Sequence, residues 1–299
     1  MITELPHVCV CICTYKRPEL LKVALEALRG QNTEGLFTFS IVIVDNDEKE
    51  LGREVATAFE SRGPVRLTYC VEPRQGIALA RNKAVANAMG DFIAFLDDDE
   101  HPDPAWLANL LSTCQATGAD GVLCPVRPHY DSGAPQWVVK CGFYDRPEYP
   151  TGTILHWRQT RTGNVLFNRD LLALVEPPFR PQFRSGEDID FFRRLMAAGR
   201  KFIWCNEAAV FETIPPVRCT RRFMLRRALL RGTCAAYHAN ALGIGKSLVA
   251  IPLYLAALPL AQVSGHHRFM ALLVKLCDHL GKLLALIGIN VVKEPYVFE

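Results

Sequence analysis

The chain has 299 residues, of which 49% are hydrophobic and 22% are charged, and its formal net charge is +3. This composition excludes an intrinsically disordered chain, because it allows a sizeable core to be buried. The net charge is too small to indicate nucleic-acid binding, and the length suits one large domain or one domain with an appendage.

The 11 cysteines include no C-x-x-C pair, and the ligand spacings of a zinc site are missing. Cys9, Cys11 and Cys13 alternate in the first apolar run, which puts them on one face of a strand as small buried hydrophobes. This usage is typical of a reducing compartment. The N-terminus shows no basic segment followed by an apolar one, so we expect no secretion signal and a cytosolic catalytic part.

Short apolar runs alternate with amphipathic stretches through the first half of the chain. The pattern predicts strands at 7–13, 39–45, 65–70, 92–96 and 121–126, and helices at 18–28, 53–60, 77–89 and 104–114. Strands that alternate with helices predict an α/β fold, in which a mostly parallel sheet is covered on both faces.

The periodicity fades between residue 127 and about residue 160, where prolines, glycines and aromatics predict substrate-binding segments above the sheet. Regular structure returns at 163–172. A helix is expected next, with Ser185 as its N-cap and acidic residues in its first turn. Two short strands are predicted at 201–205 and 208–212.

The C-terminal part differs in character, so we divide the chain into residues 1–216 and residues 217–299. Residues 220–238 predict a basic helix. Residues 247–263 carry no charge over 17 positions, which is borderline for a membrane span, because about 20 apolar residues are needed. Residues 269–291 have charges on one side only, as in an interfacial amphipathic helix. The alternative is a buried helical pair in a soluble domain.

Three polar clusters follow predicted strands at their carboxyl ends. They are residues 14–17, residues 45–47 and the acidic run at 97–99. Ligands of open parallel sheets bind at this edge, and carboxylates at this density suit Mg²⁺ or Mn²⁺. For any single cluster, a solvated acidic turn or a helix cap is the alternative, but the three in this order favour one shared site.

These motifs resemble glycosyltransferase family 2, whose members are inverting, nucleotide-sugar-dependent enzymes of the GT-A fold. The segments that carry the resemblance are VCVCICTYKRPELLKVALEAL, IVIVDND, GIALARNKAVANAMGDFIAFLDDDEHPDPAWL, TGNVLF and SGEDIDFFRRL. The resemblance implies a GT-A-like α/β fold and a metal-dependent transferase of the hexosyl type. It also implies a UDP-sugar as donor and Mn²⁺ or Mg²⁺ as cofactor.

By position in these motifs, the resemblance implies a nucleotide-sugar site and a metal site. Contacts to the donor are implied for Thr14, Tyr15, Arg17, Asp45, Asp47, Arg81, Asp97 and Asp98. Thr14 and Asp45 would hold the uracil and ribose, and Arg81 would meet the base or the pyrophosphate, which its guanidinium suits. Asp99 would ligate the metal with Asp97 as a second candidate, although a capping role for Asp97 is equally open.

The resemblance also implies that Asp188 is the general base for the acceptor hydroxyl, with Glu187 orienting the acceptor or the base. Without the family, acids that open a helix are most often caps that interact with its dipole. Glu212 stands where many relatives carry a metal-binding histidine, so it would ligate the metal or pair with an arginine. Gly163 and Asn164 belong to the region in which donor selectivity is expected.

The segment RCTRRFMLRRALLRG lacks the Q-x-x-R-W motif of processive relatives, so we expect single additions. Its arginines would contact the donor pyrophosphate, attract anionic headgroups or form a solvated face. The basic, hydrophobic and amphipathic helices together would dock the protein on the cytoplasmic face of the cell membrane, as a peripheral or monotopic protein.

The expected acceptor is therefore a lipid-linked saccharide or a glycolipid in envelope polysaccharide or glycoconjugate synthesis, and no nucleic-acid partner is expected. One alternative is a non-catalytic nucleotide-sugar-binding or scaffold protein on the same fold. The other is a sugar-phosphate nucleotidyltransferase, which should carry a glycine-rich loop after the first strand, where this chain has TYKRPE.

Overall fold

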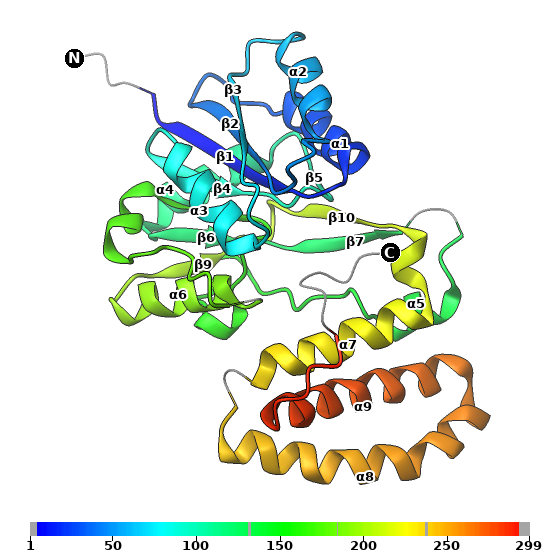
Figure 1. Cartoon of the computed structure of the whole chain (residues 1–299). Coiled ribbons are helices and arrows are strands. Elements are labelled where there is room, and N and C mark those ends of the chain that lie inside the picture. The colour runs from blue at the N-terminus through cyan, green and yellow to red at the C-terminus, as the bar shows by residue number, and fades with distance from the viewer. Residues whose placement is uncertain (1–4, 131–132, 184, 237–238, 293–299) are drawn as a thin grey trace. The chain divides into compact units, whose positions relative to one another are not determined.

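A computed structural model describes residues 5–130, 133–183, 185–236 and 239–292 (Figure 1). The chain divides into two compact units. The sheet unit comprises residues 1–129 and 146–213, and the helical unit comprises residues 130–145 and 214–299.

A seven-stranded sheet forms the centre of the sheet unit, counted over its described residues. The strand order is β3 (Leu67–Val71), β2 (Thr38–Asp45), β1 (His7–Thr14), β4 (Phe92–Phe95), β8 (Val165–Asn168), β6 (Gly121–Leu123) and β9 (Phe202–Trp204). The first four strands are parallel, and so are β6 and β9, whereas β8 runs antiparallel to both of its neighbours. The predicted mostly parallel α/β sheet is confirmed.

Alternating side chains of β1 divide the core between the two faces of this sheet. Val8, Val10 and Ile12 pack with α1 (Pro18–Arg29), α2 (Arg53–Glu60) and α4 (Trp106–Thr117). Cys9 and Cys11 pack on the other face with α3 (Ile77–Asn87) and α6 (Glu187–Ala197). Full burial of one such aliphatic side chain contributes about 1.5–3 kcal/mol. The prediction of small buried hydrophobes is confirmed for Cys9 and Cys11, whereas Cys13 is half-buried.

A second, three-stranded sheet lies beside the acidic run, again within the described residues. Its order is β5 (Glu100–Pro102), β10 (Val210–Ile214) and β7 (Val126–Tyr130). The single strand predicted at 121–126 is therefore wrong, because β6 ends at Leu123 and Val126 begins β7. Pro125 lies between them, and proline has no N–H to continue a ladder. Shorter turns of 3-10 helix lie at Trp157–Gln159, Arg169–Leu174 and Pro216–Cys219.

The start of α6 differs from the sequence prediction. Gly186 is the N-cap, with a positive φ of 84°, and as a glycine it has no side chain that could cap the helix, so the prediction of Ser185 as N-cap is wrong. The first turn carries three acids, Glu187, Asp188 and Asp190, whose negative charge complements the helix dipole. Asp190 is fully buried and pairs with Arg193 and Arg194, so its role is structural.

Helices make up most of the helical unit (Figure 1). They are α5 (Gln136–Cys141), α7 (Arg221–Ala236), α8 (Ala241–Ser264) and α9 (His266–Leu286). α9 packs on the other three. Gly232 of α7 faces the Asp278 carbonyl and Gly281 of α9 faces the Leu229 carbonyl, with no room for a Cβ at either glycine. The two backbones therefore touch, and larger residues would separate α7 from α9.

Candidate functional site

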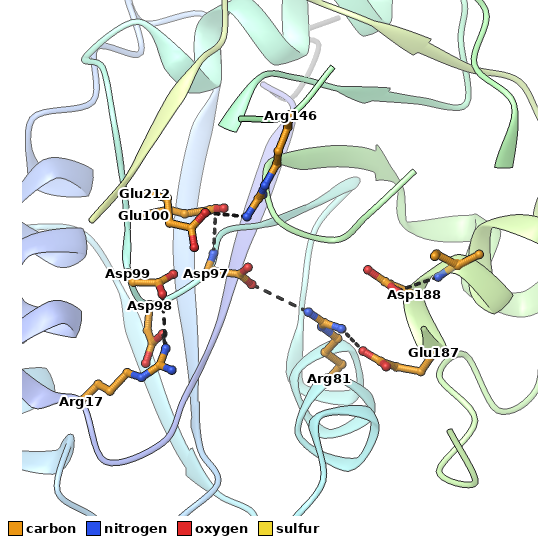
Figure 2. A network of polar contacts seen from close by, with 11 residues as sticks. Arg17, Arg81, Asp97, Asp98, Asp99, Glu100, Arg146, Glu187, Asp188 and Glu212 are labelled. Carbon is orange, nitrogen blue, oxygen red and sulfur yellow. Dashed lines mark hydrogen bonds and ion pairs between the residues drawn. The ribbon is translucent and has the colours of Figure 1, made fainter. Parts of the chain in front are cut away.

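The acidic run after β4 is held from the end of β1 (Figure 2). Thr14 Oγ1 donates to Asp98 Oδ2 (2.8 Å), and Arg17 Nη1 donates to Asp98 Oδ1 (3.1 Å) and Asp99 Oδ2 (3.3 Å). Arg17 precedes the first residue of α1, so the turn between β1 and α1 carries both groups to the neighbouring strand end. The first and third polar clusters therefore lie in contact at neighbouring strand ends.

Electrostatics in this run disfavour a full set of negative charges. Burial raises the pKa of Asp98 to about 6, with a further contribution from Asp99, although the Arg17 guanidinium and Thr14 oppose it. Burial, and next the charge of Asp97, also raise the pKa of Glu100. Glu100 Oε2 accepts from the Asp97 N–H (3.1 Å), whereas its Oε1 is buried without a hydrogen-bond partner in the described structure. Additional positive charge would stabilise this turn.

The donor set at this turn suits a divalent cation. Asp97 keeps 44% of its side-chain surface exposed, whereas Asp99 keeps 7%, and carboxylate oxygens are the ligands that Mg²⁺ and Mn²⁺ prefer. Within the described residues, no three carboxylate, imidazole or thiolate groups converge as a complete ligand set. One or two protein carboxylates with substrate phosphates are the usual arrangement for Mg²⁺, and Asp99 and Asp97 fit that arrangement.

Arg81 joins the acidic run to the first turn of α6 (Figure 2). From the buried face of α3, its Nη2 lies 3.8 Å from Asp97 Oδ1, and its Nη1 donates to Glu187 Oε1. Burial lowers the pKa of Arg81, but the charges of Glu187, Asp188 and Asp97 outweigh it and raise that pKa. Residues far apart in the sequence thus form one network, in which the Arg81 guanidinium lies between the carboxylates of Asp97 and Glu187.

Asp188 lies next to this bridge and is half-buried. Its Oδ1 accepts the N–H of Ile189 (2.8 Å), which holds the carboxylate against the start of α6. Burial raises the pKa of the adjacent Glu187 to about 7, against the opposing charge of Arg81 and with the added repulsion of Asp188. Of the two neighbouring acids, Asp188 is the more accessible and Glu187 the more deeply buried.

Replacing Glu187 by glutamine should flatten the pH dependence of stability. The folded pKa of about 7 exceeds the ordinary value of 4.5, so the native state binds the proton more tightly than the unfolded chain. This group therefore stabilises the fold most below about pH 4.5 and loses that contribution as the pH rises through about 7. Urea unfolding at pH 5 and pH 7.5 should show a drop of up to about 3 kcal/mol in the wild type and a smaller drop in Glu187→Gln.

The control for this measurement is Glu60→Gln, at an exposed position at the end of α2. It should keep the pH dependence of the wild type. An equal drop in all three proteins would contradict the buried Glu187 carboxyl as its source.

The second polar cluster, at the end of β2, is directed into the fold. Asp45 is fully buried and accepts from the Gly52 N–H (2.9 Å), the Asp47 N–H (3.1 Å) and the Tyr69 hydroxyl (2.7 Å). Its oxygens are therefore occupied within the protein. Asp47 Oδ2, by contrast, is buried without a hydrogen-bond partner among the described residues, so it is the better placed acceptor of the two.

Two further residues shape the loops around this strand end. Asn46 donates to the carbonyls of Glu72 (2.7 Å) and Arg74 (2.8 Å) and accepts from the Gly76 N–H (2.9 Å), so it ties the end of β2 to the loop before α3. The sequence places Asn46 in the second polar cluster but assigns it no role of its own, although an Asn after a strand is typical of a turn whose side chain binds backbone groups. The Tyr15 hydroxyl accepts from Gln75 of the same loop.

Asn164 lies away from solvent, and its side chain is used for structure. It is fully buried, accepts from Trp106 Nε1 (2.7 Å), and donates to the carbonyls of Pro125 (2.7 Å) and Ala208 (2.8 Å). Both side-chain N–H groups are occupied, so we no longer expect this side chain to contact the nucleotide sugar. Gly163 does adjoin the acidic run, since a Cβ there would lie 3.0 Å from Asp97 Oδ2 and 2.8 Å from Oε1 of the following Glu100.

Asn164→Ala should therefore act on stability and not on donor affinity. It leaves Trp106 Nε1 and two carbonyls unpartnered in the core, which should lower the free energy of unfolding by about 2–4 kcal/mol. Urea unfolding measures the loss, and donor titration of the folded protein should give an unchanged dissociation constant. The control Asn87→Ala, on the exposed side of α3, should stay within about 0.5 kcal/mol of the wild type.

Glu212 is paired with an arginine, one of the two roles that the sequence left open. Its Oε2 accepts from Arg146 Nη2. In the antiparallel pairing of β5 with β10, Glu212 lies directly opposite Glu100, an arrangement of like charges that needs a cation beside it. Arg146 provides that charge, and its own pKa is raised by Glu212 and Glu100 against the effect of burial. No sequence pattern singled out Arg146, because it lies alone in an irregular, proline-rich segment.

Comparisons with known proteins identify the family model and the relatives that this chain matches. The family model described as "Glycosyl transferase family 2" matches residues 9–172, more than half of the chain. The chain is similar to "Succinoglycan biosynthesis protein ExoM" of Rhizobium meliloti (strain 1021), with 34% identity over 235 residues, which cover 78% of this chain and 75% of that protein.

Two solved structures share the fold. "Mannosyltransferase PcManGT from Pyrobaculum calidifontis in complex with GDP-Man and Mn2+" superposes with a TM-score of 0.63 at 19% identity and covers 94% of this chain and 88% of its own. S. aureus TarS 1-349 in complex with UDP-GlcNAc gives a TM-score of 0.55 at 18% identity and covers 75% of this chain. The match spans 66% of that TarS chain.

Proposed function

Because the chain belongs to glycosyl transferase family 2, we propose that it is an inverting enzyme that moves a sugar from a UDP-sugar to an acceptor hydroxyl, one sugar at a time. The observation that carries this proposal is the bridge that Arg81 makes between Asp97 and Glu187. It puts a guanidinium suited to a diphosphate beside the half-buried carboxylate of Asp188.

The nucleotide side of the proposed site lies around the ends of β1 and β2. Arg17 and Asp98 would bind ribose or sugar hydroxyls. The Arg17 side chain is partly exposed, and its hydrogen bond to Asp98 fixes the position of that carboxylate. The unpartnered Asp47 Oδ2 would accept the imide N–H of uracil, which favours a uridine nucleotide. Tyr15 would lie beside the base, and the buried Asp45 would shape this part of the site rather than touch the donor.

The proposed chemistry is a single displacement at the anomeric carbon. The acceptor oxygen forms a bond to that carbon on the face opposite the diphosphate, the carbon–oxygen bond to the diphosphate breaks, and its electron pair leaves with UDP. Asp188 accepts the proton of the acceptor hydroxyl, and Glu187 keeps Arg81 in place. Arg81 would stabilise negative charge that develops on the leaving diphosphate.

Asp99, with Asp97 as a second ligand, would hold Mn²⁺ or Mg²⁺ at this site. When bound, the cation would neutralise charge on the leaving diphosphate. Glu212 is a weaker candidate, because its carboxylate already pairs with Arg146.

We further propose that the acceptor is a lipid-linked saccharide or a glycolipid, and that the protein acts at the cytoplasmic face of the cell membrane. The support is the C-terminal helix α8, which is apolar along most of its length and largely exposed. The name of the relative ExoM, a succinoglycan biosynthesis protein, is consistent with a role in polysaccharide assembly.

A donor screen tests the proposal. Thermal shift with UDP-, GDP- and dTDP-sugars in the presence of Mn²⁺ should show stabilisation by one or a few UDP-sugars, since a ligand that binds only the folded state raises its stability. Release of UDP from the selected donor should require both an acceptor extract and a divalent cation, and EDTA should remove it. Donor binding without any release under these conditions would favour the non-catalytic alternative.

A further inference from the structure

The helix α8 presents a continuous apolar surface within the helical unit. We call it the α8 outer face; its members are 54–88% exposed and include Leu248, Val249, Leu253, Leu255, Leu260 and Val263. Among the described residues, α8 is the one helix that is long and apolar enough to cross a membrane. An exposed apolar surface of this extent normally marks a site of interaction.

The opposite side of α8 is attached to α9 by specific contacts. Ser247 and Ala261 are buried, Ser247 Oγ lies 2.9 Å from His279 Nδ1, and Lys282 Nζ donates to the Gly243 carbonyl (2.9 Å). Ser247 and Ala261 lie on one side of the helix, since they are separated by 14 residues or about four turns. These contacts define which side of α8 faces outward.

The charge of this region favours a phospholipid surface as the partner. Residues 214–299 contain 11 lysines and arginines but only three acidic residues, although the whole chain has a net charge of +3. Anionic lipid headgroups attract such a segment, whereas a second copy of the same segment would be repelled. The outer face itself has no charge from residue 247 to residue 263, as contact with acyl chains requires.

The packing of α9 on α8 argues against a membrane span. α9 carries Lys275, Asp278 and Lys282 within two turns, and Asp278 pairs with Arg231 of α7 (2.8 Å). If α8 crossed the bilayer with α9 attached, these charges would enter the hydrocarbon, where each is costly. The helix pair is therefore compatible with a bilayer only if α8 lies along its surface.

Two prolines inside α8 support the same orientation. Pro252 and Pro259 have no N–H, so the carbonyls of Leu248 and Leu255 lose their donors within the helix. Both leucines belong to the outer face. Unpaired carbonyls are costly in the hydrocarbon core but can accept from water or headgroups at the interface.

We propose that the α8 outer face docks in the plane of an anionic phospholipid leaflet as a monotopic anchor, and does not span it. This inference deepens the proposed membrane location and is independent of the transfer chemistry. Leu253, near the middle of α8, would then lie at the boundary between headgroups and acyl chains, about 5–10 Å deep.

Flotation of the full-length protein with vesicles tests the docking face. The wild type should bind vesicles of phosphatidylglycerol and phosphatidylethanolamine, and bind less to pure phosphatidylcholine. The triple variant Val249→Glu, Leu253→Glu, Leu260→Glu should lower the bound fraction about tenfold or more, because it puts charge on the apolar face. The neutral triple variant with glutamine at the same positions should also reduce binding, which separates apolar contact from charge.

The matched control places the same three charges on the sheet unit, as Leu36→Glu, Met89→Glu, Leu174→Glu, at side chains that are also exposed. It should keep most of the binding. Equal loss in both triple variants, or no vesicle binding by the wild type, would overturn the proposal. So would a wild-type dimer that the α8 variant converts to a monomer, since the face would then belong to a second copy.

Depth measurements separate docking from spanning. In a Leu253→Trp variant, lipids brominated near the headgroup should quench the added fluorescence more strongly than lipids brominated near the chain end. Stronger quenching by the deep label would mean that α8 spans the bilayer, against the proposal. UDP release is assayed on the same protein samples without vesicles. Release without vesicle binding would mean that only the docking proposal fails, whereas vesicle binding without release would mean that only the proposed function fails.

Discussion

Replacing Asp188 by asparagine should lower sugar transfer by about 10²–10⁴-fold while the donor still binds. The half-buried Asp188 carboxylate lies beside the Arg81 bridge, and asparagine keeps its size and its hydrogen bond to the Ile189 N–H but cannot accept a proton from the acceptor. UDP release measures turnover, and titration with the UDP-sugar measures binding. The turnover number should fall with little change in the donor dissociation constant.

The control Asp170→Asn makes the same chemical change at an exposed position of the sheet unit and should leave transfer unchanged. Unaltered turnover in Asp188→Asn would contradict Asp188 as the base. Loss of donor binding together with turnover would instead mean that Asp188 holds the donor.

Replacing Arg81 by methionine should lower the free energy of unfolding by about 3–5 kcal/mol and abolish transfer. Arg81 and Glu187 are both buried, with 9% and 3% of their side-chain surfaces exposed, so removal of the arginine leaves an unpaired carboxylate in the core. The double variant Arg81→Met, Glu187→Leu removes both charges and should recover most of the stability but none of the transfer. Urea unfolding with UDP-release assays separates the two effects.

An exposed ion pair offers the matched control. Arg62 lies 3.5 Å from Glu26, with 63% and 46% of their side-chain surfaces exposed, so Arg62→Met should cost no more than about 1 kcal/mol and leave transfer intact. Transfer by the stable double variant would contradict the assignment of Arg81 to the leaving diphosphate. Failure of the double variant to recover stability would show that the pair is not the source of the loss.

Local patterns in the sequence predicted much of the sheet unit. The alternation in β1 and the helical period of α1 predict the correct elements. Buried side chains repeat every 2 residues in a strand and every 3.6 residues in a helix, so the apolar pattern indicates both the element and its buried face. The acidic run is predicted as a candidate site on a different ground, because its members are contiguous and follow a buried strand. The prediction is wrong at Val126, because the strand ends before Pro125 and Val126 begins a strand of the second sheet.

Contacts between distant segments were decided by the tertiary structure alone. Arg81 and Glu187 are 106 residues apart, Arg146 and Glu212 are 66 apart, and Trp106 and Asn164 are 58 apart. The sequence around a single charged or polar residue does not indicate its hydrogen-bond partner, because that partner depends on which distant segment packs beside it in the fold. For that reason Asn164 was expected at the donor and lies in the core, whereas Arg146, which no motif contains, lies beside the acidic run.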